Sequence, residues 1–148
     1  MIKNIWLNLP VANVAKSNDF FKAIGFKVNP LHEKAKDVSS FLIGENNFVL
    51  MLFPNEVFKS FTQNEIADTK NGTEVLINID AQSKEEVDEM AKTVVKAGGK
   101  VFAEPGESLG WLYGFGFEDL DGHRWNVLYM DMSKMPIPSI NKSLQSHV

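Results

Sequence analysis

The 148-residue chain contains no cysteine, and this absence excludes several chemistries at once. Without a thiol there is no disulfide, no thiolate ligand for a metal ion and no cysteine nucleophile. Histidine is also scarce: His32, His123 and His147 lie far apart and share no helical or strand spacing. The sequence therefore offers no histidine cluster of the kind that binds a metal ion.

Long apolar runs and an excess of charge of one sign are missing as well. No apolar run reaches the roughly 18 residues that span a bilayer, and the N-terminus has no signal-peptide pattern. A net charge of −4 without a basic run argues against nucleic acid or a membrane surface as a partner. A hydrophobic fraction of 44% is enough for a core, so we expect one cytoplasmic globular domain.

The chain repeats one order of elements: strand, capped helix, short strand and hairpin. In the first copy these are expected over 5–11, 14–24, 26–29 and 39–53. In the second they are expected over 74–80, 84–97, 100–103 and 113–131, with a loop over 104–111 before the hairpin. Asn13 and Ser83 are the expected N-caps, and Gly25 and Gly98 the expected helix stops.

The last hairpin carries the most distinctive motif, the turn Asp119-Leu-Asp-Gly-His123 between two aromatic-rich strands. Alternation predicts one core face per strand, formed by Phe115, Phe117, Trp125, Val127 and Tyr129. The carboxylates of Glu118, Asp119 and Asp121 are expected to form turn hydrogen bonds and to be solvated. For His123 we expect a hydrogen bond to neighbouring backbone rather than a catalytic role.

The run from Phe117 to Asn126, Phe-Glu-Asp-Leu-Asp-Gly-His-Arg-Trp-Asn, resembles the closing hairpin of the vicinal oxygen chelate superfamily. This superfamily includes glyoxalase I, the bleomycin-resistance proteins and the extradiol dioxygenases. The resemblance covers residues 2–131 and implies an α+β fold, in which two βαβββ modules form a curved mixed sheet with a central cleft and outer helices. It divides the chain into module one (1–53), a connector (54–72) that carries a short helix, module two (73–131) and a C-terminal tail (132–148).

Enzymes of this superfamily hold a divalent metal with His, Gln or Glu side chains from the first and last strand of each module. The resemblance places these positions at Trp6, at Leu76 or Glu74, at Asn126 and in the strand 48–53, which has no ligand-type residue. Tryptophan is no ligand, and neutral asparagine is a poor one for a divalent transition ion. We therefore expect no metal and no other cofactor bound in the manner of the family.

Asparagines occupy matching places in the two modules. Asn8 and Asn78 are repeat mates, and Asn126 follows in the last strand. Either these amides converge in a cleft that binds a neutral or weakly polar molecule, or they face solvent or bond each other. The predicted ligand-binding residues are Trp6, Asn8, Glu74, Asn78, Trp111, Tyr113 and Asn126.

Two functions follow from the resemblance. The first is a glyoxalase/bleomycin-resistance-like protein that binds a small organic molecule in its cleft without a metal. The second is a metal-dependent glyoxalase-like lyase or dioxygenase with Glu74 as general base, and fold resemblance alone supports it. We also expect a homodimer, because relatives with short modules often complete the cleft with a second chain. Aromatic residues outside the two repeats agree with this, unless the connector folds over them in a monomer; they are Phe58, Phe61, Trp111 and Tyr113.

Overall fold

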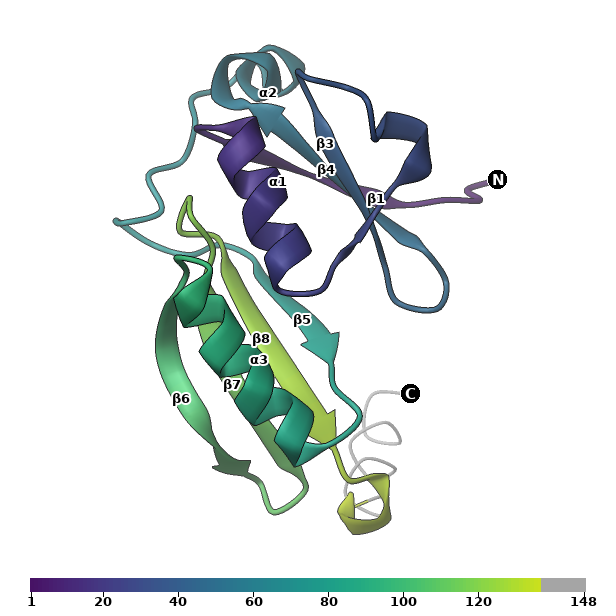
Figure 1. Cartoon of the computed structure of the whole chain (residues 1–148), viewed down its shortest axis with the longest axis vertical. Helices are drawn as coiled ribbons and strands as arrows, with labels where there is room; N and C mark the ends of the chain where they lie inside the picture. Colours follow the sequence, from purple (N-terminus) through teal and green to yellow (C-terminus); the bar gives the residue numbers. More distant parts are fainter. Residues whose placement is uncertain (137–148) are drawn as a thin grey trace, which may run out of the picture.

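The computed structural model of the chain describes residues 1–136 and shows two βαβββ modules, as expected (Figure 1). Residues 132–136 of the predicted tail contain one short helical turn, η2 (Met132–Lys134), and the rest of the tail lies outside the described residues. Among residues 1–136, no helix is long and apolar enough to cross a membrane.

Module one forms a four-stranded mixed sheet, here called sheet A, with strand order β1-β4-β3-β2. Its first strand, β1, runs parallel to β4, while β3 is antiparallel to both of its neighbours. Its elements are β1 (Trp6–Val11), α1 (Val14–Ala23), β2 (Lys27–Val28), the short turn η1 (Pro30–His32), β3 (Ser39–Ile43) and β4 (Phe48–Pro54).

Module two repeats this topology in sheet B, with strand order β5-β8-β7-β6 and β5 parallel to β8. Its elements are β5 (Leu76–Asp80), α3 (Lys84–Lys96), β6 (Lys100–Ser108), β7 (Leu112–Glu118) and β8 (Arg124–Met130). The connector between the modules contains the predicted short helix, α2 (Asn55–Thr62). The α+β fold with two modules is thus confirmed, and its strands form two hydrogen-bonded sheets rather than one.

Local hydrogen bonds explain why the two long helices begin and end where they do. The side chain of Asn13 accepts a hydrogen bond from the Lys16 amide at 2.9 Å, and Ser83 accepts one from the Glu86 amide at 3.1 Å. Each bond satisfies an N–H group that has no partner within the helix. Gly25 and Gly98 both adopt φ of 103°, a conformation that ends a helix without a Cβ clash.

One predicted loop is wrong. The segment 104–111 was expected to be irregular, but β6 continues through it to Ser108, and only Leu109, Gly110 and Trp111 connect it to β7. Pro105 is tolerated because β6 is an edge strand, where a missing backbone donor leaves no partner unsatisfied. The pairing of β6 with β7 shifts register near Phe102, which makes the strand irregular and hides its period of two. The strand predicted over 74–80 begins later, at Leu76.

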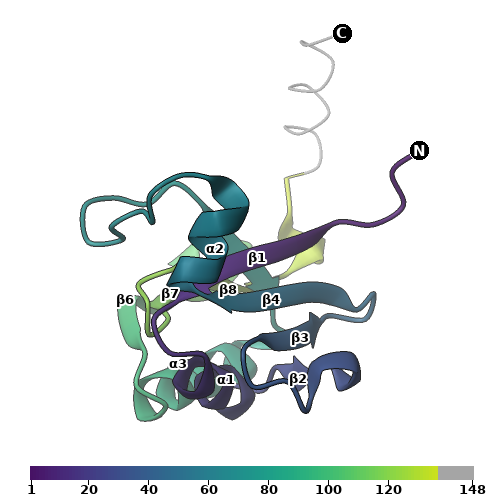
Figure 2. The ribbon, with the colours of Figure 1, turned by 90° about the horizontal axis from the view of Figure 1, so that it is seen from above.

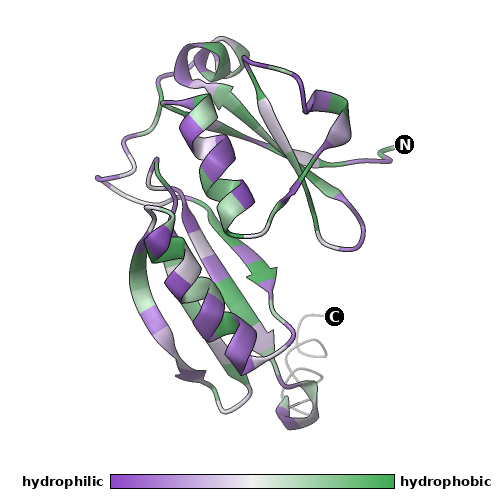
Figure 3. Ribbon diagram, viewed as in Figure 1, coloured by the Kyte–Doolittle hydropathy of each residue, from purple (hydrophilic) through white to green (hydrophobic). Residues whose placement is uncertain are grey.

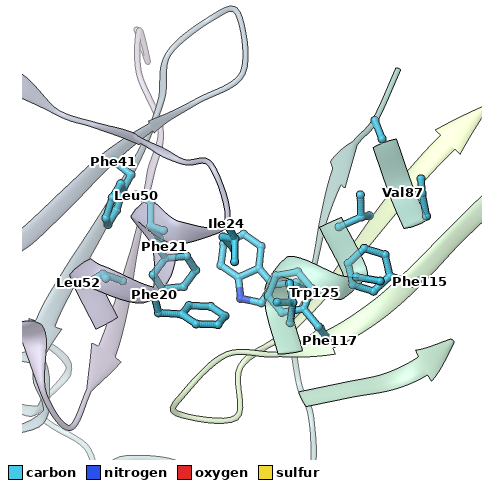
Figure 4. Packing of buried hydrophobic residues seen from close by; sticks show 14 of the residues in the cluster. Phe20, Phe21, Ile24, Phe41, Leu50, Leu52, Val87, Phe115, Phe117 and Trp125 are labelled. Atoms are coloured by element: carbon cyan, nitrogen blue, oxygen red, sulfur yellow. The ribbon is translucent and has the colours of Figure 1, made fainter. Parts of the chain in front are cut away.

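A single hydrophobic core joins the two modules. Figure 2 shows α1 and α3 on one side of the molecule and α2 on the other, and Figure 3 shows α1 and α3 striped in hydrophilic and hydrophobic residues. The rings of Phe21 and Trp125 lie 5.6 Å apart, and those of Phe20 and Phe117 lie 6.3 Å apart, so aromatic contacts cross between modules (Figure 4). Burial of this aromatic area makes the pair of modules one folding unit.

Candidate functional site

Each sheet packs one face against its long helix and leaves the opposite face largely open, although α2 covers the end of sheet A, where the rings of Phe53 and Phe61 lie 5.1 Å apart. On sheet A the strand residues that pack into the core alternate with a second set, which forms the open face. Cross-strand neighbours on this open face are Trp6 with Val49 and Asn8 with Met51. A hollow of about 540 Å³ lies against it, lined in part by Trp6, Val49, Met51 and Phe53, and we call it the sheet A hollow.

On sheet B the open face brings two predicted binding residues together. Asn78 of β5 lies directly opposite Asn126 of β8, so these two amides are neighbours as expected. Gly116 is the neighbour of Asn126 on its other side, and the ring of Phe102 covers this glycine. The third amide, Asn8, belongs to sheet A, so one chain does not gather the three asparagines on one sheet.

Arg124 is a residue of the open face that the sequence reasoning missed. Its Nη2 donates to Glu118 Oε1 at 2.9 Å, and its guanidinium lies 4.2 Å from the centre of the Phe102 ring. Strict alternation around buried Trp125 puts Arg124 on the same face as Asn126, so the signal was present in the sequence. The face therefore carries one ion pair beside its neutral amides.

A second cavity, the junction pocket, lies where the modules meet and the connector crosses them. Its volume is about 380 Å³, and β1, the connector, the start of β5 and the turn before β8 line it. Two of the predicted residues, Asn8 and Glu74, reach this pocket. Its other lining residues include Leu7, Leu9, Phe58, Glu65, Val75, Ile77, His123 and Arg124.

The turn 119–123 is organised by the carboxylate of Asp119. Its Oδ1 accepts hydrogen bonds from the amides of Asp121 and His123, both at 3.0 Å, and its Oδ2 accepts one from Trp125 Nε1 at 3.1 Å. The predicted turn hydrogen bonds are confirmed, but Asp119 is 6% exposed, so its predicted solvation is wrong. Burial raises the pKa of Asp119, while the nearby His123 and these hydrogen bonds act in the opposite direction.

The same turn also fastens module two to module one. Asp121 Oδ1 accepts from the Ala12 amide at 2.8 Å, and Oδ2 accepts from Ser17 Oγ at 3.3 Å. His123 Nε2 lies 2.7 Å from the Pro10 carbonyl oxygen. His123 does contact a backbone group, but the predicted neighbouring partner in the turn is wrong, because the carbonyl belongs to Pro10 of module one. These contacts hold the turn against the end of β1 and the start of α1.

Tyr113 does not lie where the binding hypothesis needs it. The Tyr113 hydroxyl donates to Asp88 Oδ1 of α3 at 2.6 Å, and Lys84 lies over its ring, so this side chain faces the helix and not the open face. The hydrogen bond to Asp88 is the main cause that raises the pKa of Tyr113. Trp111 is half-buried in the turn between β6 and β7.

The side chains at the family's metal positions do not fit a divalent metal ion. On the open faces these positions hold Trp6, Val49 or Met51, Leu76 and Asn126, and none of these side chains is a carboxylate or an imidazole. Glu74 precedes β5 instead of lying in it. Among residues 1–136, no three His, Asp or Glu side chains gather into a possible metal site. The donor set thus gives no basis for a metal-dependent step.

Two βαβββ modules with outer helices are the architecture that the closing hairpin implied. The sequence agrees with the fold, because residues 5–127 match the model of the Glyoxalase/Bleomycin resistance protein/Dioxygenase superfamily. The chain belongs to this superfamily. The resemblance of the closing hairpin is thereby confirmed.

Solved structures with the same fold show how far the similarity extends. The hypothetical protein SA1046 from S. aureus is 37% identical, with a TM-score of 0.77, and the match covers 86% of this chain and 94% of that one. A family enzyme from Burkholderia phytofirmans PsJN is 15% identical, with a TM-score of 0.70 and coverages of 85% and 98%. The fosfomycin resistance protein FosX from Listeria monocytogenes, complexed with Mn(II) and sulfate, is 20% identical, with a TM-score of 0.64 and coverages of 90% and 94%. No curated protein matches the sequence.

Proposed function

We propose that this protein binds a small organic molecule between the open faces of its sheets and does so without a metal ion. One observation carries the proposal: the positions from which relatives would hold a metal present amides and apolar or aromatic side chains, including Trp6, Met51, Leu76 and Asn126. Such a lining suits a neutral ligand with an aromatic or apolar body and a few polar groups, since amides both donate and accept.

Exposure of large apolar side chains supports a homodimer as the binding form. Trp6 is 58% exposed on sheet A, and Leu76 and Met130 are 45% and 41% exposed on sheet B. Covering these side chains with another protein surface removes apolar area from water, which favours association. We propose that a twofold-related copy places the open face of its sheet B over the sheet A hollow, so that Asn8 meets Asn78 and Asn126 of the partner subunit.

Metal analysis of the purified protein tests the absence of a metal. We expect less than stoichiometric Mn, Ni, Zn or Fe, and no rise of the melting temperature when these ions are added, because the donor set is poor. A stoichiometric metal, or a large thermal shift with one ion, would refute this part of the proposal. That outcome would favour the metal-dependent lyase or dioxygenase.

A thermal-shift screen of neutral aromatic compounds tests binding, because a ligand that binds only the folded state raises the melting temperature. For any hit, we expect Asn78→Leu to raise the dissociation constant about tenfold, because the ligand loses one amide contact. Asn71→Leu is the matched control, because Asn71 is an exposed amide of the connector. Hits that bind both variants as well as the unaltered chain would contradict the proposed site.

A further inference from the structure

The junction pocket shares Asn8 and Arg124 with the open faces described above, but the connector and the turn before β8 also line it, and its charges point to a ligand of its own. Four ionisable side chains line it, and two of them already have partners. Glu65 pairs with Lys59 at 3.0 Å, and Arg124 pairs with Glu118 at 2.9 Å. Within residues 1–136, the carboxylate of Glu74 has neither an ion-pair partner nor a side-chain hydrogen bond. An unpaired negative charge therefore remains at the pocket wall.

His123 adds an acceptor to the same wall. Its Nε2 lies 2.7 Å from the carbonyl oxygen of Pro10. A carbonyl can only accept a hydrogen bond, so Nε2 must carry the proton. In the neutral ring Nδ1 is then free to accept, and it has no hydrogen-bond partner within residues 1–136.

Asn8 supplies the third acceptor. Its Oδ1 is buried and has no hydrogen-bond partner in the described part of the chain. A buried acceptor without a donor is unfavourable. Because this atom is closed off from solvent, a ligand donor reaches it only if the Asn8 side chain turns toward the pocket, and that bond would then add binding free energy. Arg124 Nε also lacks a partner, but Glu118 neutralises that guanidinium and Phe102 covers it. The neutral amides and hydroxyls of the lining can donate or accept, so the carboxylate of Glu74 is the unpaired charge of the pocket within residues 1–136.

The rest of the lining combines large apolar side chains with small and neutral polar residues, among them Thr62, Asn64, Thr69 and Thr73. Phe58 comes from α2, and the other apolar side chains come from β1, β5 and the residue before β5; they are Leu7, Leu9, Val75 and Ile77. A molecule that satisfies both parts of the lining has several N–H donors and a positive charge at one end, and an apolar body at the other.

We propose that the junction pocket binds a small organic cation, an ammonium or amidinium group on an apolar body, with Glu74 as its counter-ion. The site lies within one chain. It therefore requires neither the homodimer nor the absence of a metal, and it can fail or hold independently of the proposed function.

Benzamidine is a suitable probe, because its planar amidinium can bond both oxygens of a carboxylate. Benzoate has the same ring and the opposite charge. We expect titration with benzamidine to shift the backbone amide resonances of Thr73, Glu74 and His123, and benzoate to leave them unchanged. The isosteric change Glu74→Gln should weaken benzamidine binding at least tenfold.

Glu45→Gln is the matched control, because Glu45 is an exposed carboxylate in the turn between β3 and β4, away from the pocket lining. It should bind benzamidine as the unaltered chain does, and so should Asn78→Leu, which belongs to the other proposed site. Equal binding of benzamidine and benzoate would overturn the proposal. So would an unchanged dissociation constant in Glu74→Gln, or no binding at millimolar benzamidine.

Discussion

Single carboxylates decide much of the structure at the residue scale. Asp119 is almost fully buried, yet three donors from its own hairpin surround it. Asp121, two residues on, instead bonds the Ala12 amide and Ser17 of module one. Asp119 thus stabilises its own hairpin, whereas Asp121 links the hairpin to module one. The two roles differ because the two side chains leave the turn in different directions.

Tyr113 provides a pH-dependent prediction at this scale. Its hydrogen bond to Asp88, followed by burial and by the charge of Asp88, raises its pKa. For a group with a raised folded-state pKa, the contribution to stability is complete below the ordinary tyrosine value of about 10 and is lost as the pH rises through the folded value. Asp88→Asn removes the negative charge, so it should move the ionisation of Tyr113 to lower pH.

Ultraviolet difference absorbance can follow this ionisation in a Tyr129→Phe background, because Tyr113 is then the only tyrosine of the two in the chain that remains. Glu89→Gln is the control, since Glu89 is exposed and follows Asp88 on α3. Identical titration curves for Asp88→Asn and Glu89→Gln would show that Asp88 does not set the pKa of Tyr113.

Helices and strands pack closely around Gly99, just after α3. A Cβ added there would lie 2.8 Å from Val94, 2.9 Å from Phe20 and 3.0 Å from the Glu118 carbonyl oxygen. Phe20 belongs to α1 and Glu118 to β7, so this glycine sits where an element of module one meets two elements of module two. The cause is close packing, because buried neighbours have little freedom to move away.

We therefore predict that Gly99→Ala lowers the free energy of unfolding by roughly 1–3 kcal/mol, the usual cost of forcing atoms into a packed core. Gly72→Ala is the matched control, because a Cβ at Gly72 meets no atom within 4 Å. Urea denaturation measures both variants. If both variants lose the same free energy of unfolding, the packing explanation is wrong, and the loss comes from a general effect of replacing glycine.

At the scale of the whole molecule, the two modules share one core but turn separate open faces to their surroundings. The rings of Phe21 and Trp125 connect the modules inside. Trp6 and Leu76, on the open faces of different sheets, remain 58% and 45% exposed. The partner proposed above is a second copy, since closed twofold packing would cover both faces.

Light scattering at micromolar concentration should therefore give twice the 16.6 kDa mass of one chain. Trp6→Glu should shift this mass toward the monomer, because it buries a charge in the proposed interface. Val95→Glu is the control, since Val95 is also 58% exposed but lies on α3. A single-chain mass for the unaltered protein would refute the dimer, and an unchanged mass in Trp6→Glu would refute this interface.

The sequence by itself determined the local elements and the family. The caps Asn13 and Ser83, the stops at Gly25 and Gly98 and the alternation around Trp125 predicted both long helices and the closing hairpin correctly. Strand alternation also predicts that Tyr113 lies on the core face, because it shares that face with Phe115. These features could be predicted because hydrogen bonds and steric contacts within a few residues of the chain decide them.

Only the tertiary structure decided the arrangement of the site. Asn8 and Asn78 have matching surroundings in sequence, yet they lie in different sheets, and their relative placement depends on how α1 and the turn 119–123 hold the modules together. The junction pocket likewise joins Asn8, Glu74 and His123 from three distant segments. Their positions follow from packing over the whole core. A period of two or 3.6 residues specifies which face of a strand or helix a residue occupies, but not which other element packs against that face.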